Sequence, residues 1–187
     1  MPEGLANGPD GRPRCAWAVS APEYVAYHDE EWGRPVHDDD ALFERLCLEA
    51  FQSGLSWLTI LRKRENFRAA FAGFEIARVA DFGERDVERL MADAGIVRNR
   101  AKILAAINNA RVARGLDTGL GELLWSFAPD PRPRPSSGAE VPSSTPESKA
   151  LARELKRRGF AFLGPTTVYA AMQACGLVDD HLEGCSA

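Results

Sequence analysis

Apolar residues recur at helical spacing along most of the chain and predict an all-α fold. Within residues 38–54, Leu42, Leu46 and Ala50 lie four residues apart, and Gly54 ends the run. Positions four apart share one face of a helix, so this stretch predicts an amphipathic helix packed on a core. The aspartates at its start suit an N-cap and the positive end of the helix dipole.

The same spacing predicts seven further helices. Proline or a capping residue begins several of them, and glycine ends several. They are expected at about residues 21–33, 57–74, 83–95, 98–115, 120–129, 144–159 and 166–175. The chain shows no convincing alternation typical of a half-buried strand, and no internal repeat.

Two segments lack this periodicity. Residues 1–13 are rich in Gly and Pro and are expected to form a disordered N-terminal extension. Residues 128–144 are expected to form a flexible Pro/Ser-rich surface loop. Residues 14–187 are then expected to be one domain, the default for a chain of 187 residues.

Composition narrows the class of protein. Apolar residues make up 45% of the chain, which is enough for a core, and no apolar run is long enough to span a bilayer. The N-terminus lacks the apolar segment of a secretory signal, so a cytoplasmic location is expected. The net charge of -4 does not indicate a nucleic-acid binder, although basic patches occur at residues 61–68, 98–102 and 156–158. Each patch taken alone is typical of a solvated helix face.

A metal site is one interpretation of the cysteines and histidines. His181 and Cys185 lie four residues apart near the C-terminus, and Cys15 and His28 form a similar pair near the N-terminus. Together they make a Cys2His2 set, which fills a tetrahedral structural zinc site and leaves no position for water. The spacings fit no standard zinc-finger pattern, so surface histidines and buried thiols remain the alternative.

Four stretches of the chain, in this order, resemble the bacterial DNA-3-methyladenine glycosylase I family. They are RCAWAVSAPEYVAYHDEEWG, LCLEAFQSGLSWLTILRKRENFRAAF, DAGIVRNRAKILAAINNA and TTVYAAMQACGLVDDHLEGC. The resemblance runs from about Arg14 to Cys185. It implies a helix-hairpin-helix glycosylase fold in residues 14–187. It also implies one structural zinc ion that joins the terminal segments through Cys15, His28, His181 and Cys185.

The resemblance also implies a function. The enzyme would flip 3-methyladenine out of double-stranded alkylated DNA and hydrolyse its bond to the sugar, leaving an abasic site for base excision repair. No lyase activity is implied, and neither is a lysine nucleophile. The protein is expected to be a monomer that neither associates with a membrane nor requires a protein partner.

Glu49 is the candidate critical acid. Its carboxylate would accept hydrogen bonds from the purine and favour its positive charge, an effect that desolvation strengthens. From the residues alone, the favoured interpretation of Glu49 is a surface ion-pair partner of Arg45, four residues earlier. The resemblance favours the base-contacting role.

Aromatic residues are the candidate walls of the base site. Trp57 would stack on the cationic purine, and Tyr27 would be held in place by the adjacent ligand His28. Tyr24, Trp17 and Trp32 are candidates to complete the wall, with core packing as the alternative for the two tryptophans.

Two loops are candidates for DNA contact. The loop QSGLSW would act as a probe, with Leu55 wedged into the gap left by the flipped base and Gln52 against the orphaned partner. The hairpin DAGIVRNRAK would bind phosphate through backbone N–H groups and basic side chains. The DNA-contact candidates are Gln52, Gly54, Leu55, Gly95, Arg98, Arg100 and Lys102.

Two other classes of function compete with the glycosylase. A non-catalytic binder of alkylated DNA would use the same pocket and release no base. A zinc-stapled helical adaptor for protein partners would have no affinity for damaged duplex.

Overall fold

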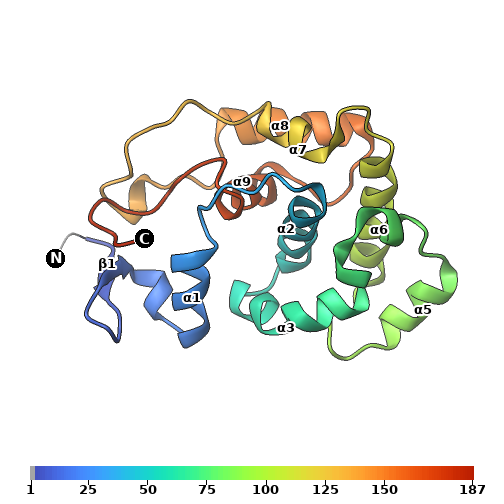
Figure 1. Cartoon of the computed structure of the whole chain (residues 1–187), viewed down its shortest axis with the longest axis horizontal. Coiled ribbons are helices and arrows are strands. Elements are labelled where there is room, and N and C mark those ends of the chain that lie inside the picture. Colours follow the sequence, from blue (N-terminus) through green and yellow to red (C-terminus); the bar gives the residue numbers. More distant parts are fainter. Residues whose placement is uncertain (1–2) are drawn as a thin grey trace.

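The chain folds into nine α-helices and one short β-hairpin within residues 3–187, which the computed structural model describes (Figure 1). The helices are α1 (Pro22–Glu30), α2 (Asp39–Gln52), α3 (Trp57–Ala70), α4 (Ile76–Ala80), α5 (Glu84–Ala92), α6 (Arg100–Arg114), α7 (Gly119–Trp125), α8 (Pro146–Arg158) and α9 (Pro165–Ala174). Single 3-10 turns occur at Ala16–Val19, Ala72–Phe74 and Gly138–Glu140. All eight predicted helices are present, and α4 escaped prediction because five residues are too few to show periodicity.

The prediction of a disordered extension at residues 1–13 is wrong for its described part, and Met1 and Pro2 lie outside the described residues. Strands β1 (Leu5–Asn7) and β2 (Pro13–Cys15) pair antiparallel, with Leu5 opposite Cys15. Three-residue strands are too short to show alternation, and their stability comes from tertiary contacts that a Gly/Pro-rich composition does not reveal.

Helix α2 lies at the centre of the fold and contacts α3, α6, α7 and α9 (Figure 1). Its N-cap is Asp38, whose side chain accepts the Ala41 N–H at 2.9 Å. Most of α2 is buried, in a continuous apolar core that includes a group of fully buried phenylalanines: Phe43, Phe51, Phe67, Phe71 and Phe74. Because α2 is enclosed, a polar side chain on its last turn is also removed from water.

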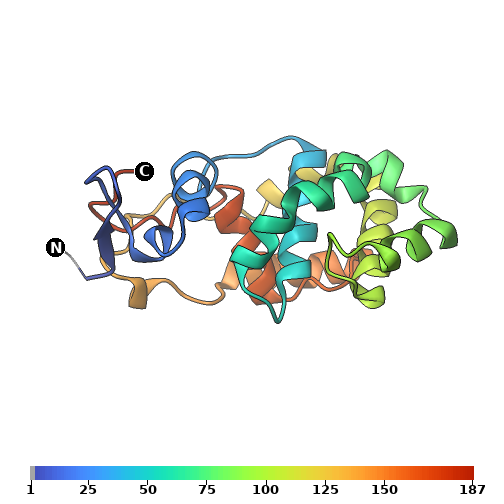
Figure 2. The same cartoon turned by 90° about the horizontal axis from the view of Figure 1, so that it is seen from below.

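The two ends of the chain lie side by side (Figures 1 and 2). The Ser186 N–H donates to the Pro13 carbonyl at 2.9 Å, and Leu182 and Cys185 pack against Leu5 and Cys15. We call residues 5–33 together with the tail 176–187 the terminal lobe, and residues 39–174 the helical body.

The segment 128–144 is a loop apart from the Gly138–Glu140 turn, but side chains tie it to the tail. Arg132 donates to Asp180 at 2.6 Å, and Arg134 donates to Asp179 at 2.9 Å. Ion pairs of this kind were not visible in the Pro/Ser-rich sequence that predicted flexibility. No described helix combines the length and apolar character that a membrane span requires.

Candidate functional site

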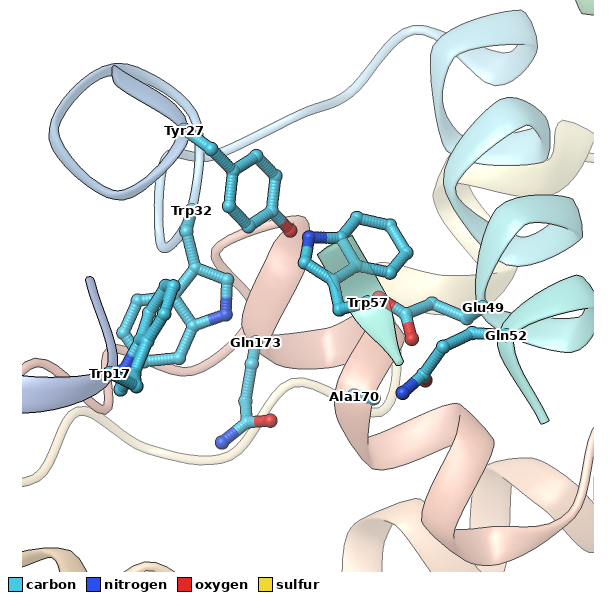
Figure 3. A pocket seen from close by; sticks show the side chains of 8 residues that line it. All are labelled: Trp17, Tyr27, Trp32, Glu49, Gln52, Trp57, Ala170 and Gln173. Carbon is cyan, nitrogen blue, oxygen red and sulfur yellow. The ribbon is translucent and has the colours of Figure 1, made fainter. Parts of the chain in front are cut away.

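A cavity of about 190 Å³ lies where the terminal lobe meets the helical body (Figure 3). Its volume is below the roughly 300–1,000 Å³ of sites for drug-sized ligands, which suits a single planar base. The lobe supplies three aromatic side chains, and α2, α3 and α9 supply the rest. The lining residues are Trp17, Tyr27, Trp32, Glu49, Gln52, Trp57, Ala170 and Gln173.

Glu49 is the acidic side chain of this cavity. It lies on the last turn of α2 and is only 5% exposed. Burial raises the pKa of its carboxyl to about 8, and the positive charge of Arg45 offsets only part of that rise. The surface ion-pair interpretation is therefore wrong, because Arg45 instead bonds Glu31 and the Ala174 carbonyl, each at 3.4 Å.

Tyr27 and Trp57 lie together on the cavity wall, with ring centroids 5.4 Å apart and planes tilted by 45°. Tyr27 comes from α1 and is buried. Burial raises the pKa of its hydroxyl above the ordinary value, and the nearby Glu49 carboxyl adds to this rise. Trp57 begins α3, whose N-cap is Ser56. Its indole Nε1 is buried and has no hydrogen-bond partner among residues 3–187.

Trp17 and Trp32 form the lobe side of the cavity and contact each other edge to face, with centroids 5.1 Å apart. Tyr24 does not line the cavity. It packs edge-on against Trp17 at 5.5 Å and supports that ring from outside. Tyr24 is therefore removed from the candidate wall, since its ring packs on Trp17 and is not among the lining residues.

Two lining residues were missed by the sequence analysis. Ala170 and Gln173 project from α9, and the Gln173 amide donates to Asp180 at 2.8 Å. Gln173 is a polar residue within an otherwise apolar stretch of α9, and this is the one sequence signal that singles it out.

The second cluster gathers cysteines and a histidine from both ends of the chain. Ligand atoms of Cys15, His28 and Cys185 all lie within 4.8 Å of one another, with Cys185 Sγ and His28 Nε2 3.5 Å apart. The His181 ring packs against His28 with centroids 4.7 Å apart, but its Nε2 lies 3.3 Å from the His28 carbonyl. Three of the four predicted ligands thus share one site, and the fourth lies beside it.

Carboxylates orient both histidine rings. His28 Nδ1 lies 2.8 Å from Asp29, and His181 Nδ1 lies 2.7 Å from Asp179. A carboxylate that bonds Nδ1 fixes the ring and leaves Nε2 to bind a metal, as in many zinc sites. Burial, as the largest influence, lowers the pKa of His28 and favours the neutral ring that metals require.

The two clusters are in contact through aromatic rings. Trp32 packs on His181 with centroids 4.7 Å apart, and Tyr27 precedes His28 on α1. The position of the cavity's lobe wall therefore depends on the Cys/His cluster behind it.

The loop after α2 opens to solvent beside the cavity. Leu55 is 41% exposed, and Gly54 adopts a φ of +84°, which favours glycine. The Gln52 amide donates to the Leu55 carbonyl at 3.4 Å while Gln52 also lines the cavity. The predicted probe residues are thus adjacent in space, at the edge of the base-sized cavity.

The predicted phosphate-binding hairpin requires one correction, at Lys102. Gly95 is closely packed, since an added Cβ would come within 2.9 Å of the Asp93 side chain and 3.1 Å of the Asn66 side chain of α3. Lys102 does not face solvent: it is 9% exposed and donates to two backbone carbonyls. Arg98 and Arg100 are exposed, and Arg100 pairs with Glu84.

Comparisons with known proteins identify the family. A family model described as methyladenine glycosylase matches residues 17–187. DNA-3-methyladenine glycosylase 1 of Escherichia coli is 49% identical over 178 residues, covering 92% of this chain and 95% of that protein. A Haemophilus influenzae DNA-3-methyladenine glycosylase is 42% identical over 184 residues, covering 92% and 96%.

Solved structures agree with this match. A crystal structure of 3-methyladenine DNA glycosylase I superposes with a TM-score of 0.89 at 49% identity, covering 93% of this chain and 98% of that one. A variant of 3-methyladenine DNA glycosylase I in complex with 3-methyladenine superposes with a TM-score of 0.87 at 36% identity, covering 92% and 96%. The chain, with its cavity of buried acid and aromatic rings, belongs to the methyladenine glycosylase family.

Proposed function

We propose that this protein is a DNA repair glycosylase that excises 3-methyladenine from alkylated double-stranded DNA. The observation that carries the proposal is Glu49, a buried carboxyl in a base-sized cavity shared with Tyr27 and Trp57. A buried acid without an ion-pair partner is unfavourable for folding, and a cationic ligand gives it a function.

Selection of the base follows from charge. Methylation of the purine ring places a positive charge on the base, whereas normal adenine is neutral. Before the base binds, Glu49 is mainly protonated at neutral pH, and the cationic base favours its ionised form, with loss of the proton to solvent. The water-poor cavity strengthens the attraction between the two charges. Stacking on Trp57, Trp17 and Trp32 adds cation–π attraction, which a neutral base does not receive to the same extent.

The chemical step needs modest assistance. The bond between the sugar and the purine breaks, its electron pair neutralises the cationic base, and water adds to the sugar carbon with loss of a proton to solvent. The base leaves without being protonated, so no general acid is required. Recognition is the main role assigned to Glu49, and its negative charge also favours the developing sugar cation.

DNA binding is assigned to the face that carries the 52–55 loop and the α5–α6 connection. We propose that α5, this connection and α6 form a helix-hairpin-helix element. Leu55 is exposed and suited to fill the gap left by the flipped base, with Gln52 beside it. Arg98 is exposed next to the start of α6 and suited to a phosphate contact.

We further propose one structural zinc ion at the Cys/His cluster. Zinc holds sulfur at about 2.3 Å and imidazole nitrogen at about 2.0 Å in a tetrahedron. Such ligands lie about 3.5–4 Å apart, and the Cys185–His28 separation of 3.5 Å fits this spacing. Cys15, His28 and Cys185 would hold the ion with His181 as the fourth ligand, and the ion would fasten the tail to the hairpin.

One assay tests the function. Purified protein is incubated with duplex DNA treated with a methylating agent, and the released bases are separated by chromatography. Free 3-methyladenine is expected. Tight binding to methylated DNA without release would instead select the non-catalytic binder, and absence of both would reject any role in DNA repair.

A further inference from the structure

Lys102 joins two parts of the proposed DNA-binding face. It lies in the first turn of α6, where its own N–H donates to the N-cap side chain of Asn99 at 3.1 Å. Its ammonium group crosses to the end of α2 and donates to the Phe51 carbonyl at 2.9 Å and the Ser53 carbonyl at 2.6 Å. Lys102 is 9% exposed, so a phosphate has little access to this charge.

The two carbonyls flank the start of the 52–55 loop. The last carbonyls of a helix lack partners within the helix and carry the negative end of its dipole. The loop itself is otherwise held by short-range bonds: the Leu55 N–H donates to the Gln52 carbonyl at 2.7 Å, and the Gln52 amide donates to Leu55 at 3.4 Å. Neither of these bonds connects the loop to another element.

We propose that Lys102 is a positioning residue that fixes the 52–55 loop relative to the α5–α6 hairpin. This role rests on the proposed function, because it matters only if the loop enters DNA while the hairpin holds the backbone. With Lys102 in place, Leu55 and Gln52 meet the duplex at a fixed distance from the phosphate contacts. Without it, the loop moves independently of the hairpin.

Three variants separate this positioning role from the effects of losing a positive charge or of misfolding. Lys102→Met keeps the length of the side chain and removes all donors, whereas Lys102→Arg keeps donors. Lys149→Met removes a positive charge from an exposed position on α8 and serves as the matched control. Circular dichroism establishes that each variant is folded before other measurements begin.

The first readout is the loop itself. Hydrogen exchange, followed by mass spectrometry on peptides covering residues 51–56, should be faster by about tenfold in Lys102→Met. The loop opens more easily in this variant, because the two hydrogen bonds from Lys102 no longer hold it closed. Exchange in α3 and α9 should stay as in the wild type. Lys102→Arg should restore most of the protection, and Lys149→Met should leave it unchanged.

The second readout separates the loop from the base cavity. Affinity for free 3-methyladenine, measured by quenching of tryptophan fluorescence, should change less than twofold in Lys102→Met, because Lys102 does not line the cavity. Single-turnover excision from duplex DNA should fall by roughly tenfold to a hundredfold, as small misplacements of positioning groups do.

Two results would overturn the proposal. One is unchanged exchange at residues 51–56 in Lys102→Met. The other is an equal loss of free-base affinity and excision, which would indicate distortion of α2 and its Glu49. Failure of the wild type to release 3-methyladenine would instead reject the proposed function, and the exchange data would still report on the loop.

Discussion

The helical body buries a continuous apolar core, whereas the apolar cluster of the terminal lobe contains four buried residues, Leu5, Cys15, Leu182 and Cys185. Two of those four are cysteines of the proposed metal site. A cluster this small contributes little burial energy, so polar groups and the proposed metal site would have to stabilise the lobe. We therefore expect loss of these groups to destabilise the lobe more than the body.

Arg14 is the principal polar tie in the lobe. Its guanidinium is 2% exposed and bonds Asp29 at 2.7 Å and Asp10 at 2.6 Å. Asp29 in turn holds His28 at 2.8 Å. One arginine thus connects β2, α1 and the Cys/His cluster.

The comparison has a functional consequence. The cavity takes its acid from the body and three of its aromatic rings from the lobe. Changes in the lobe should therefore affect stability first and base binding second, whereas changes at Glu49 should affect base binding and excision and leave the lobe intact.

The largest expected effect is on the lobe. His181→Ala should lose zinc and destabilise the protein by about 3–5 kcal/mol, since structural zinc contributes directly to folding. Metal analysis and thermal unfolding measure the two effects. His37→Ala, at an exposed position outside the cluster, is the control. A full equivalent of zinc in His181→Ala would contradict the proposed ligand set.

Glu49→Gln should impair base binding and excision while leaving the lobe folded. Excision of 3-methyladenine should fall by roughly 10²–10³-fold, as losses of one well-placed electrostatic group do, and the lobe should retain its zinc. Single-turnover kinetics measures the rate. Glu65→Gln, on the exposed face of α3, should excise like the wild type. An unchanged rate in Glu49→Gln would remove Glu49 from the site.

Arg14→Met should destabilise the lobe by about 2 kcal/mol, because it leaves the half-buried Asp29 without its partner. Chemical unfolding measures the loss. Arg12→Met is the matched control, since Arg12 is 53% exposed and lies 3.9 Å from Asp29. If both variants unfolded alike, the buried ion pair would not be a major tie.

Stability should also depend on pH through Glu49. Its folded-state pKa of about 8 exceeds the ordinary value of 4.5, so the folded protein keeps a proton that the unfolded chain loses. The free energy of unfolding should therefore fall as pH rises between these values, by about 1.4 kcal/mol per pH unit. Comparing wild type with Glu49→Gln at pH 6 and pH 7 isolates this contribution. Identical slopes in the two proteins would contradict it.

Sequence by itself determined the helices and much of the site. Apolar spacing, N-cap residues and stop glycines are local signals, and all eight helices expected from them are present. Resemblance to a family identified Glu49, Tyr27 and Trp57 before the fold was known, and all three line the cavity. Those residues lie in continuous motifs, which sequence comparison detects.

Tertiary structure alone decided which way individual side chains point and what they meet. Lys102 and Arg100 lie two residues apart in one basic patch of α6. The Lys102 side chain is nevertheless buried against the end of α2, whereas that of Arg100 faces solvent. Tyr24 and Tyr27 lie one turn apart on α1, and only Tyr27 reaches the cavity. The hairpin at residues 5–15 packs on Leu182 and Cys185, and Gln173 lines the cavity with Trp17 and Trp32, so both depend on partners distant in sequence. Burial and hydrogen bonding to such partners are properties of the packed chain, and local composition does not encode them.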